Sequence, residues 1–346
     1  MRHESEYLQA KRTAIQGQDK SEAGDCAWLY VRIYCQMAEA DDVLLELVAP
    51  LMERLLKEGL IRRSFFIRYF EGGHHLRVRF YGQKAVLFDS VRVIVHQSIS
   101  EYFARQGQVV HTPLVWEPGV VDDLVSQTQR HTDTQRSVPS YEYDRYEPEI
   151  ERYGGQEGLY ISEQHFADSS AIALRVLIQE RNGAGSRRNA ALLLLHTLAE
   201  SFRLDNEQKA SSFEQQYLYR ASVAWRTPPS REVLAQEYER HRIKMQLLLP
   251  LVPQSPVHQS YAVWLPLVEQ WRIEVSQTYR ALMRLQEQNV LLTPPIVIMS
   301  SYIHMLCNRL GLFLREEAYL CYLLYRRYAQ QQMENAIDVS TPLGLL

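Results

Sequence analysis

Apolar and polar positions alternate along the first part of the chain. The segment AWLYVRIYCQM, which follows Cys26, is rich in aromatic and β-branched residues, and FFIRYFEGGHHLRVRF, at 65–80, interleaves such residues with arginine at a period of two. This pattern is typical of β-strands. A Gly-Gly pair divides the second segment, which therefore predicts a β-hairpin. One more extended piece is expected before the ERYGG turn at 151–155, and a short strand near 108–116.

Helical spacing of apolar positions lies between these strands. It predicts a helix over 42–58, with Asp41 or Asp42 as its N-cap. Pro50 is expected to kink that helix or to mark its true start, because proline has no backbone N–H to donate. A second amphipathic helix is expected near 84–106. Helices between strands of this kind favour a sheet with helices on one face.

Nearly everything from Tyr160 onward has a helical pattern, broken by glycine and proline. The breaks fall at 183–185, 228–229, 250–256 and 294–295. The sequence therefore predicts an α+β fold with a mainly antiparallel N-terminal sheet, flanking helices, and a largely helical C-terminal half. The expected organisation is a flexible arm over 1–25, a single domain over 26–335 with a sheet part at 26–155 and a helical part at 156–335, and a polar surface loop at 117–142.

Composition adds limits to the function. The chain has 346 residues, a formal net charge of -3 and a sequence pI near 6.4, so it has no global attraction for nucleic acid or an anionic membrane. Its four cysteines form no CxxC pair and no ligand spacing with histidine, so no metal site is expected. The absence of a membrane-length apolar run and of a signal-peptide core predicts a cytoplasmic protein.

The hairpin carries the first candidate site. Period-two spacing places Arg77 and Arg79 on the same face of its second strand. Two adjacent guanidinium groups repel each other unless an anion lies between them, so the pair suggests a clamp for a small carboxylate or phosphate. A solvated strand face with scattered charge explains the same residues.

Two more clusters place ionisable groups in unusual surroundings. Arg152 precedes a Tyr-Gly-Gly turn, and His304 lies in an otherwise apolar helix, five residues before Arg309. Ionisable groups in apolar surroundings are destabilising unless they are paired, which makes each a candidate. Arg152 could instead form an ion pair with Glu149 or Glu151, and His304 could be a hydrogen-bonded core residue.

Four ordered motifs, FFIRY, HHLRVRF, ERYGG and IHMLCNRL, resemble the C-terminal domain of lantibiotic dehydratases, which is also found as separate thiopeptide-type bacteriocin biosynthesis proteins. The resemblance runs from Trp28 to about Tyr328. It implies an enzyme that removes glutamate from glutamylated Ser or Thr of a ribosomally made precursor peptide, leaving dehydroalanine or dehydrobutyrine. The long glutamylating portion of fused members is missing here, so the chain resembles the free-standing half of a split dehydratase.

The resemblance also assigns roles by position. It implies that His304, Arg79 and Arg152 are catalytic, with His304 as a base or proton donor and the arginines holding the glutamyl carboxylates. The residues expected to contact the substrate are Arg77, His75, Arg68, Tyr153 and Arg309. Arg77, Arg79, Arg152 and His304 are expected to converge on one cleft. The sequence departs from the family pattern at 71–74 and in the loop at 117–142.

Two alternatives stay open. A second branch of the same family forms the pyridine ring of thiopeptides by a formal [4+2] cycloaddition of two dehydroalanines, and a non-catalytic scaffold could bind the leader peptide. The glutamate-elimination activity implies two partners, the precursor peptide and a separate glutamyl-tRNA-dependent glutamylating subunit. No cofactor, no direct nucleic-acid binding and no membrane span are expected. The oligomeric state is open, with a homodimer as the commonest arrangement among soluble oligomers.

Overall fold

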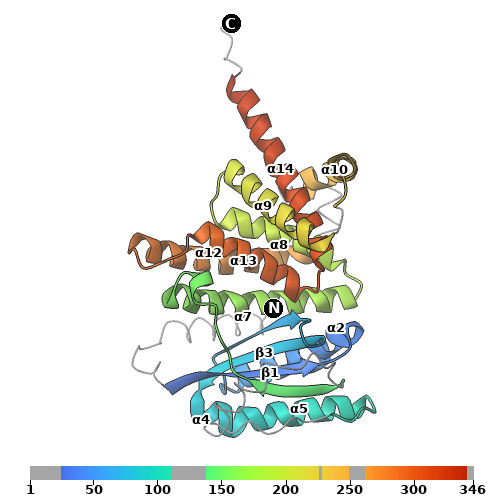
Figure 1. Ribbon diagram of the computed structural model, residues 1–346, viewed down its shortest axis with the longest axis vertical. Helices are drawn as coiled ribbons and strands as arrows, with labels where there is room; N and C mark the ends of the chain where they lie inside the picture. Colours follow the sequence, from blue (N-terminus) through green and yellow to red (C-terminus); the bar gives the residue numbers. More distant parts are fainter. Residues whose placement is uncertain (1–24, 111–137, 226–227, 249–261, 341–346) are drawn as a thin grey trace. The chain divides into compact units, whose positions relative to one another are not determined.

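The computed structural model describes residues 25–110, 138–225, 228–248 and 262–340 (Figure 1). The chain divides into two compact units, Met1–Glu147 and Pro148–Leu346. In the described residues, the first unit contains the sheet and the second contains helices without strands. The division lies close to the junction predicted between the sheet and helical parts, and the grouping of both parts in one domain stays a prediction.

Several predicted segments lie outside the described residues. These are the N-terminal arm up to residue 24, most of the strand near 108–116, the break at 250–256, and the loop at 117–142 up to residue 137. The end of that predicted loop is wrong, because residues 140–142 belong to a strand. This strand, β4 (Ser140–Asp144), alternates Tyr141 and Tyr143 with polar residues, a period-two pattern that the polar composition of the segment obscured.

The first unit contains a four-stranded antiparallel sheet in the order β2-β3-β1-β4. Its strands are β1 (Cys26–Tyr34), β2 (Arg63–Tyr69), β3 (His75–Gln83) and β4. The predicted hairpin is confirmed as β2 and β3. Gly72 and Gly73 close it with φ of 74° and 105°, a conformation that only glycine adopts readily.

The two faces of the sheet differ in chemistry. Leu29, Val31 and Ile33 of β1 share one face with Leu76 and Val78 of β3, and all five are at most 2% exposed. In Figure 1, α5 (Arg92–Arg105) lies along one face of the sheet. The alternate positions of β1 and β3 carry tyrosine and arginine on the opposite face. That face holds the first group of candidate site residues.

The helix predicted over 42–58 begins earlier, so the Asp41 and Asp42 cap is wrong. A 3-10 turn at Met37–Glu39 leads into α2 (Ala40–Val43), and Gln36 forms the cap with Glu39. A π-helical turn, Leu44–Val48, then precedes α3 (Ala49–Lys57). Pro50 has no N–H for the carbonyl four residues earlier, and a widened π turn is a common response to such a missing bond.

The helix predicted near 84–106 is also confirmed, again with a π-helical turn inside it. Its parts are α4 (Lys84–Val86), the π turn Leu87–Val91, and α5. The fold of this unit is therefore the sheet with helices that the hydrophobic pattern predicted, which together with the second unit makes an α+β chain.

The second unit is a helical bundle, as predicted. Its helices are α7 (Gln156–Arg181), α8 (Arg187–Ser201), α9 (Asn206–Ala224), α10 (Arg231–Leu248), α12 (Leu265–Glu287), α13 (Pro295–Arg309) and α14 (Leu314–Ser340), with 3-10 turns at Glu151–Tyr153 (η5) and Ala262–Trp264 (η6). The sequence missed two breaks. One is the capping box of Asp205 and Gln208, which starts α9, and the other is at Gly311, with φ of 74°, between α13 and α14.

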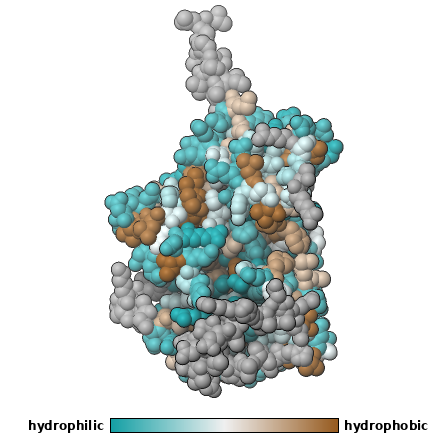
Figure 2. All heavy atoms as spheres, in the orientation of Figure 1, coloured by the Kyte–Doolittle hydropathy of each residue, from teal (hydrophilic) through white to brown (hydrophobic). Residues whose placement is uncertain are grey.

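The core of this unit lies where α12 packs against α7 and α8 (Figure 1). Trp271 of α12 is fully buried, and its indole N–H donates to the carbonyl of Leu194 at 3.0 Å. Exposed apolar side chains include Leu218, Val223 and Leu292. In Figure 2, the hydrophobic side chains on the visible face are separated by hydrophilic ones. No helix in the described part of the chain is long and apolar enough to cross a membrane.

Candidate active site

Arg77 and Arg79 lie on the same face of β3, as the period-two spacing predicts. Across the ladder, Arg77 is opposite Arg32 of β1 and Arg79 is opposite Tyr30. The acidic residues of this face, Glu142 and Asp144 on β4, both pair with Arg32. The two β3 arginines therefore add two further positive charges to a face that already carries Arg32.

Arg79 is a buried guanidinium enclosed by aromatic rings. Its side chain is 6% exposed, and its guanidinium carbon lies 4.6 Å from the ring centre of Tyr30, 5.1 Å from Phe65 and 4.7 Å from Tyr146. Within the described residues its Nε has no hydrogen-bond partner and no carboxylate pairs with it. Burial lowers the pKa of Arg79, which reflects the free-energy penalty of an uncompensated charge. A bound anion would remove that penalty.

His75 holds Arg77 rather than pointing to open space. Its Nδ1 donates to the carbonyl of Gly73 at 2.8 Å, which leaves Nε2 to accept from Arg77 Nε at 3.2 Å. Burial lowers the pKa of His75 to about 4, with Arg77 and Arg32 contributing, so the ring is neutral at pH 7. The guanidinium of Arg77 also stacks on Tyr69, 3.3 Å from the ring centre. The role of His75 as a substrate contact stays a prediction, and this geometry favours a supporting role.

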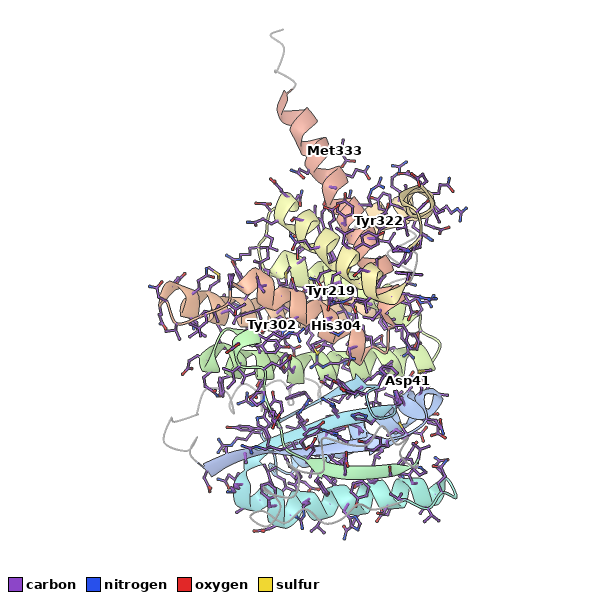
Figure 3. All side chains as sticks on the ribbon, viewed as in Figure 1. Asp41, Tyr219, Tyr302, His304, Tyr322 and Met333 are labelled. Atoms are coloured by element: carbon purple, nitrogen blue, oxygen red, sulfur yellow. The ribbon has the colours of Figure 1, made fainter. Side chains whose placement is uncertain are left out.

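Arg68 lies on the other face of the sheet. It is opposite Leu76 in the ladder, one residue out of phase with Arg77. Its guanidinium donates to Asp41 of α2 at 2.6 Å, and its side chain is 8% exposed. Figure 3 labels Asp41 in the sheet unit. The structure thus does not place Arg68 beside Arg77 and Arg79, and its pairing favours a structural role over the predicted substrate contact.

In the helical unit, Arg152 lies in η5, just before the Gly154-Gly155 turn that starts α7. Its Nε donates to Oγ of Ser301 on α13 at 2.9 Å, and its NH1 pairs with Glu149 at 3.1 Å. The ion pair with Glu149, which the sequence offered as the other explanation for Arg152, is therefore present. However, Arg152 is 40% exposed and Glu149 is 61% exposed, and such pairs stabilise a protein by only about 0 to 1 kcal/mol.

The segment between α12 and α13 fixes the position of η5. The N–H of Leu292 donates to the carbonyl of Gly154 at 3.0 Å, and the hydroxyl of Thr293 donates to the carbonyl of Glu151 at 2.9 Å. Ser301, the partner of Arg152, lies three residues before His304. Residues at this spacing lie on the same side of a helix, with Cβ atoms about 5 to 6 Å apart. Arg152 and His304 are therefore close to one side of α13.

His304 is held by a buried carboxylate. Its Nδ1 lies 2.9 Å from Oε2 of Glu317 on α14, and the other oxygen of Glu317 accepts from Arg220 of α9 at 2.7 Å. Figure 3 shows His304 and Tyr302 on α13. Burial alone would raise the pKa of Glu317, but the hydrogen bond and charge of His304 and the charge of Arg220 lower it below its ordinary value. The ionised carboxylate then keeps the proton on Nδ1 and leaves Nε2 as the basic nitrogen.

The side chain of His304 is 27% exposed, whereas that of Glu317 is 2% exposed. Within the described residues, Nε2 of His304 makes no hydrogen bond. The residue types, geometry and exposure are those of a general base with an orienting carboxylate. Sequence reasoning missed both Glu317 and Arg220. The available signal was an acid in the largely apolar segment LREEAYLCYLLY.

Tyr153 and Arg309, two of the predicted substrate contacts, are interior residues. Tyr153 is 4% exposed and packs on Phe166 and Tyr302, with ring centres 5.0 and 6.2 Å away. Arg309 is 1% exposed, and its Nε donates to Oγ of Ser170 at 3.0 Å. This placement favours packing roles, and the predicted contacts with substrate are untested.

The sheet arginines and the Arg152–His304 pair belong to different units, so their expected convergence on one cleft stays a prediction. The described residues contain no group of three or more His, Cys, Asp or Glu side chains that could hold a metal ion. The cysteines are free thiols, and burial raises the pKa of Cys35 to about 12.

The family model of the lantibiotic biosynthesis dehydratase C-terminal domain matches residues 28–329. This chain belongs to that family. The match covers all four motifs that carry the resemblance, and it includes Arg79, Arg152 and His304. The family assignment links the chain to lantibiotic and bacteriocin biosynthesis.

Two curated relatives are similar to parts of the chain. The subtilin biosynthesis protein SpaB of Bacillus subtilis is 23% identical over 193 residues, which are 55% of this chain and 16% of SpaB. The nisin biosynthesis protein NisB of Lactococcus lactis subsp. lactis is 21% identical over 209 residues, which are 60% of this chain and 17% of NisB. The matched region is thus less than a fifth of either relative.

Three solved structures share the fold. The tRNA-dependent lantibiotic dehydratase MibB from Microbispora sp. 107891 matches with a TM-score of 0.63 and 21% identity, over 92% of this chain and 29% of MibB. The pyridine synthase TbtD from thiomuracin biosynthesis matches with a TM-score of 0.62 and 19% identity, over 88% and 98%. TsrL matches with a TM-score of 0.59 and 17% identity, over 89% and 96%.

Proposed function

We propose that this chain eliminates glutamate from glutamylated Ser or Thr residues of a precursor peptide, which gives dehydroalanine or dehydrobutyrine. The observation that carries the proposal is the arrangement on α13. The Nδ1 of His304 is fixed by Glu317, and one turn earlier Ser301 holds Arg152. A base and a carboxylate-binding cation thus lie near one another within one compact unit.

His304 would remove the proton from the α-carbon of the esterified residue. The electrons of that C–H bond form the Cα–Cβ double bond, the bond between Cβ and the ester oxygen breaks, and glutamate leaves as a carboxylate. Nε2 accepts the proton, and Glu317 stabilises the imidazolium that forms. A positioned general base of this kind contributes about 10² to 10⁴ in rate.

The arginines would bind the departing glutamate. Its ester oxygen becomes a carboxylate only as the bond breaks, so a guanidinium placed there binds more strongly in the transition state than in the ground state. Arg152 supports this role because it is part exposed and only weakly paired. Arg79 supports it because a buried cation with aromatic walls lacks a carboxylate partner within the described residues.

The proposal requires two partners, the precursor peptide and a separate subunit that attaches glutamate from glutamyl-tRNA. The test is a reconstitution that combines the precursor peptide, the glutamylating subunit, glutamyl-tRNA and this protein. The mass of the peptide is then measured by mass spectrometry. Peptide that has lost water relative to the precursor supports elimination. Peptide that retains glutamate adducts in the presence of the wild-type protein contradicts it.

A second candidate is pyridine formation. It is favoured by one observation, that the alignment covers 98% of the pyridine synthase TbtD. The same assay separates the two reactions, because a pyridine synthase would leave glutamylated peptide unchanged and convert an already dehydrated peptide to a macrocycle. A protein that binds the leader and changes neither substrate would be a scaffold.

A further inference from the structure

A cavity of about 180 Å³ opens in the sheet unit where β4 ends. Its walls are mostly aromatic, with Trp28 and Tyr30 from β1, Phe88 from the π turn before α5, and Tyr143 and Tyr146 from β4 and the residues after it. Asp144 and Arg145 are also among its lining residues. All of these residues belong to one compact unit, so the cavity is a property of that unit.

The cavity exists because β1 is longer than β4. The ladder between them runs from Tyr34 opposite Ser140 to Tyr30 opposite Asp144, and Figure 1 shows β1 extending past β4. Beyond that point the hydrogen-bonded ladder ends, and the N–H of Arg145 donates to its neighbour Asp144 at 2.7 Å. Tyr146 stays beside this end of β1, with its ring centre 5.4 Å from that of Trp28. Within the described residues, no strand continues the ladder beside Ala27–Leu29. An open strand edge of this kind accepts an extended peptide as an additional strand.

Two walls of the cavity are shared with the Arg79 site. Tyr30 and Tyr146 line the cavity, and their ring centres lie 4.6 and 4.7 Å from the Arg79 guanidinium carbon. A peptide residue in the cavity therefore contacts two residues that also contact Arg79.

The size of the cavity limits the occupant. A closed apolar cavity of about 150 Å³ accommodates benzene, whereas sites for drug-sized ligands and cofactors measure roughly 300 to 1,000 Å³. A space of about 180 Å³ matches one Leu, Ile or Phe side chain. The aromatic walls favour such an apolar group over a charged one.

We infer that this cavity is a specificity subsite for one aliphatic or aromatic side chain of the precursor peptide, close to the Ser or Thr that loses glutamate. The peptide lies extended along the open edge of β1. This inference rests on the proposed function for the identity of the peptide, but the recognition itself is independent of the chemical step.

The test uses synthetic glutamylated peptides that differ only at one residue flanking the modified Ser, which is Leu, Ala or Asp in turn. We expect wild-type protein to process the Leu peptide with a kcat/KM about tenfold or more above that of the Ala peptide, and the Asp peptide least well. Phe88→Trp puts a larger side chain in the wall of the cavity, and it leaves Arg79 and His304 unsubstituted. It should remove the preference for Leu over Ala.

Phe88→Ala enlarges the cavity and should shift the preference towards a Trp peptide, which keeps the test valid if Phe88→Trp folds poorly. Binding of the same peptides, followed by fluorescence anisotropy, separates this inference from the proposed function. A preference for Leu in binding without elimination supports the subsite and contradicts the eliminase. Equal binding and turnover of all the peptides at every flanking position would overturn the subsite. The subsite would also be overturned if both Phe88 variants changed the thermal stability of the protein but kept the wild-type ratio of kcat/KM for the Leu and Ala peptides. That result would show that the protein's own chain fills the cavity.

Discussion

Glu317 of α14 accepts a hydrogen bond from Nδ1 of His304 on α13 at 2.9 Å, from a position that is 2% exposed. This contact fixes the ring of a part-exposed histidine through a carboxylate that water barely reaches. It also joins two helices that are adjacent in sequence but separated by the turn at Gly311. The proposed base is therefore oriented by the fold itself.

Replacing the orienting carboxylate should slow elimination, and it should also lower the free energy of unfolding because Arg220 loses its buried carboxylate partner. Glu317→Gln keeps the size of the side chain but removes its charge, so the tautomer and the imidazolium of His304 lose their support. We expect kcat to fall by about tenfold or more, as when the carboxylate of a catalytic triad is neutralised, with a smaller change in KM. Glu316→Gln is the matched control, because Glu316 pairs with Arg188 at the surface. Equal rates for the two variants would contradict the orienting role.

Arg79 and Arg68 should respond in opposite ways to the same substitution. Arg79→Met removes a buried charge that has no carboxylate partner in the described structure, so the free energy of unfolding should be unchanged or higher while elimination falls by about 10². Arg68→Met removes a charge-assisted bond to Asp41 and should lower the free energy of unfolding by about 1.5 to 3 kcal/mol. Chemical denaturation and peptide assays measure both effects. A large loss of stability in Arg79→Met alone would indicate that Arg79 is structural.

His75 should make the protein sensitive to acid. Its pKa is about 4 in the folded chain and about 6.5 in an unfolded one, so the unfolded state binds more protons between these pH values. The contribution of neutral His75 to the free energy of unfolding is complete above about pH 6.5 and is lost as the pH falls towards 4. The total is on the order of 3 kcal/mol. Urea unfolding at pH 7 and pH 5 should show a smaller pH effect in His75→Asn than in wild type or His241→Asn. An identical pH effect in all three would be inconsistent with a neutral buried His75.

Gly158 should be intolerant of any side chain. A Cβ built there would lie 2.1 Å from the carbonyl oxygen of Tyr153 and 2.8 Å from Leu291. Because the first contact is with the backbone, the clash can be relieved only by a shift of the turn that carries Arg152. Gly158→Ala should lower the free energy of unfolding by about 1 to 3 kcal/mol and reduce elimination. Glu157→Ala, one residue earlier and exposed, is the control. A Gly158→Ala protein with wild-type stability and rate would show that η5 can shift freely.

Local pattern was enough to predict much of the fold. Period-two alternation predicted the β2–β3 hairpin and the common face of Arg77 and Arg79, because both depend on residues close in sequence. Arg68 shows the limit of this reasoning. Its place on the opposite face depends on the register across the Gly72-Gly73 turn, which spacing along one strand cannot supply.

The residues that hold His304 could not be predicted from the sequence for a similar reason. Arg220 and Glu317 are 97 residues apart, and only the packing of α9 and α14 brings them together. Motif resemblance pointed to His304 and Arg152, but it gave no information on Ser301, which joins Arg152 to α13. Long-range polar contacts of this kind depend on tertiary packing rather than on propensity.

The proposed role of His304 as the base that releases glutamate can be measured by single-turnover mass spectrometry on a purified glutamylated peptide. Wild-type protein and the control variant His241→Ala should convert the glutamate adduct to the dehydrated residue at the same rate. His304→Ala should bind the peptide but leave the adduct in place, with a rate lower by about 10² or more. Turnover by His304→Ala at the wild-type rate would show that His304 is not the base, and an adduct that wild type leaves unchanged would show that the protein is not an eliminase.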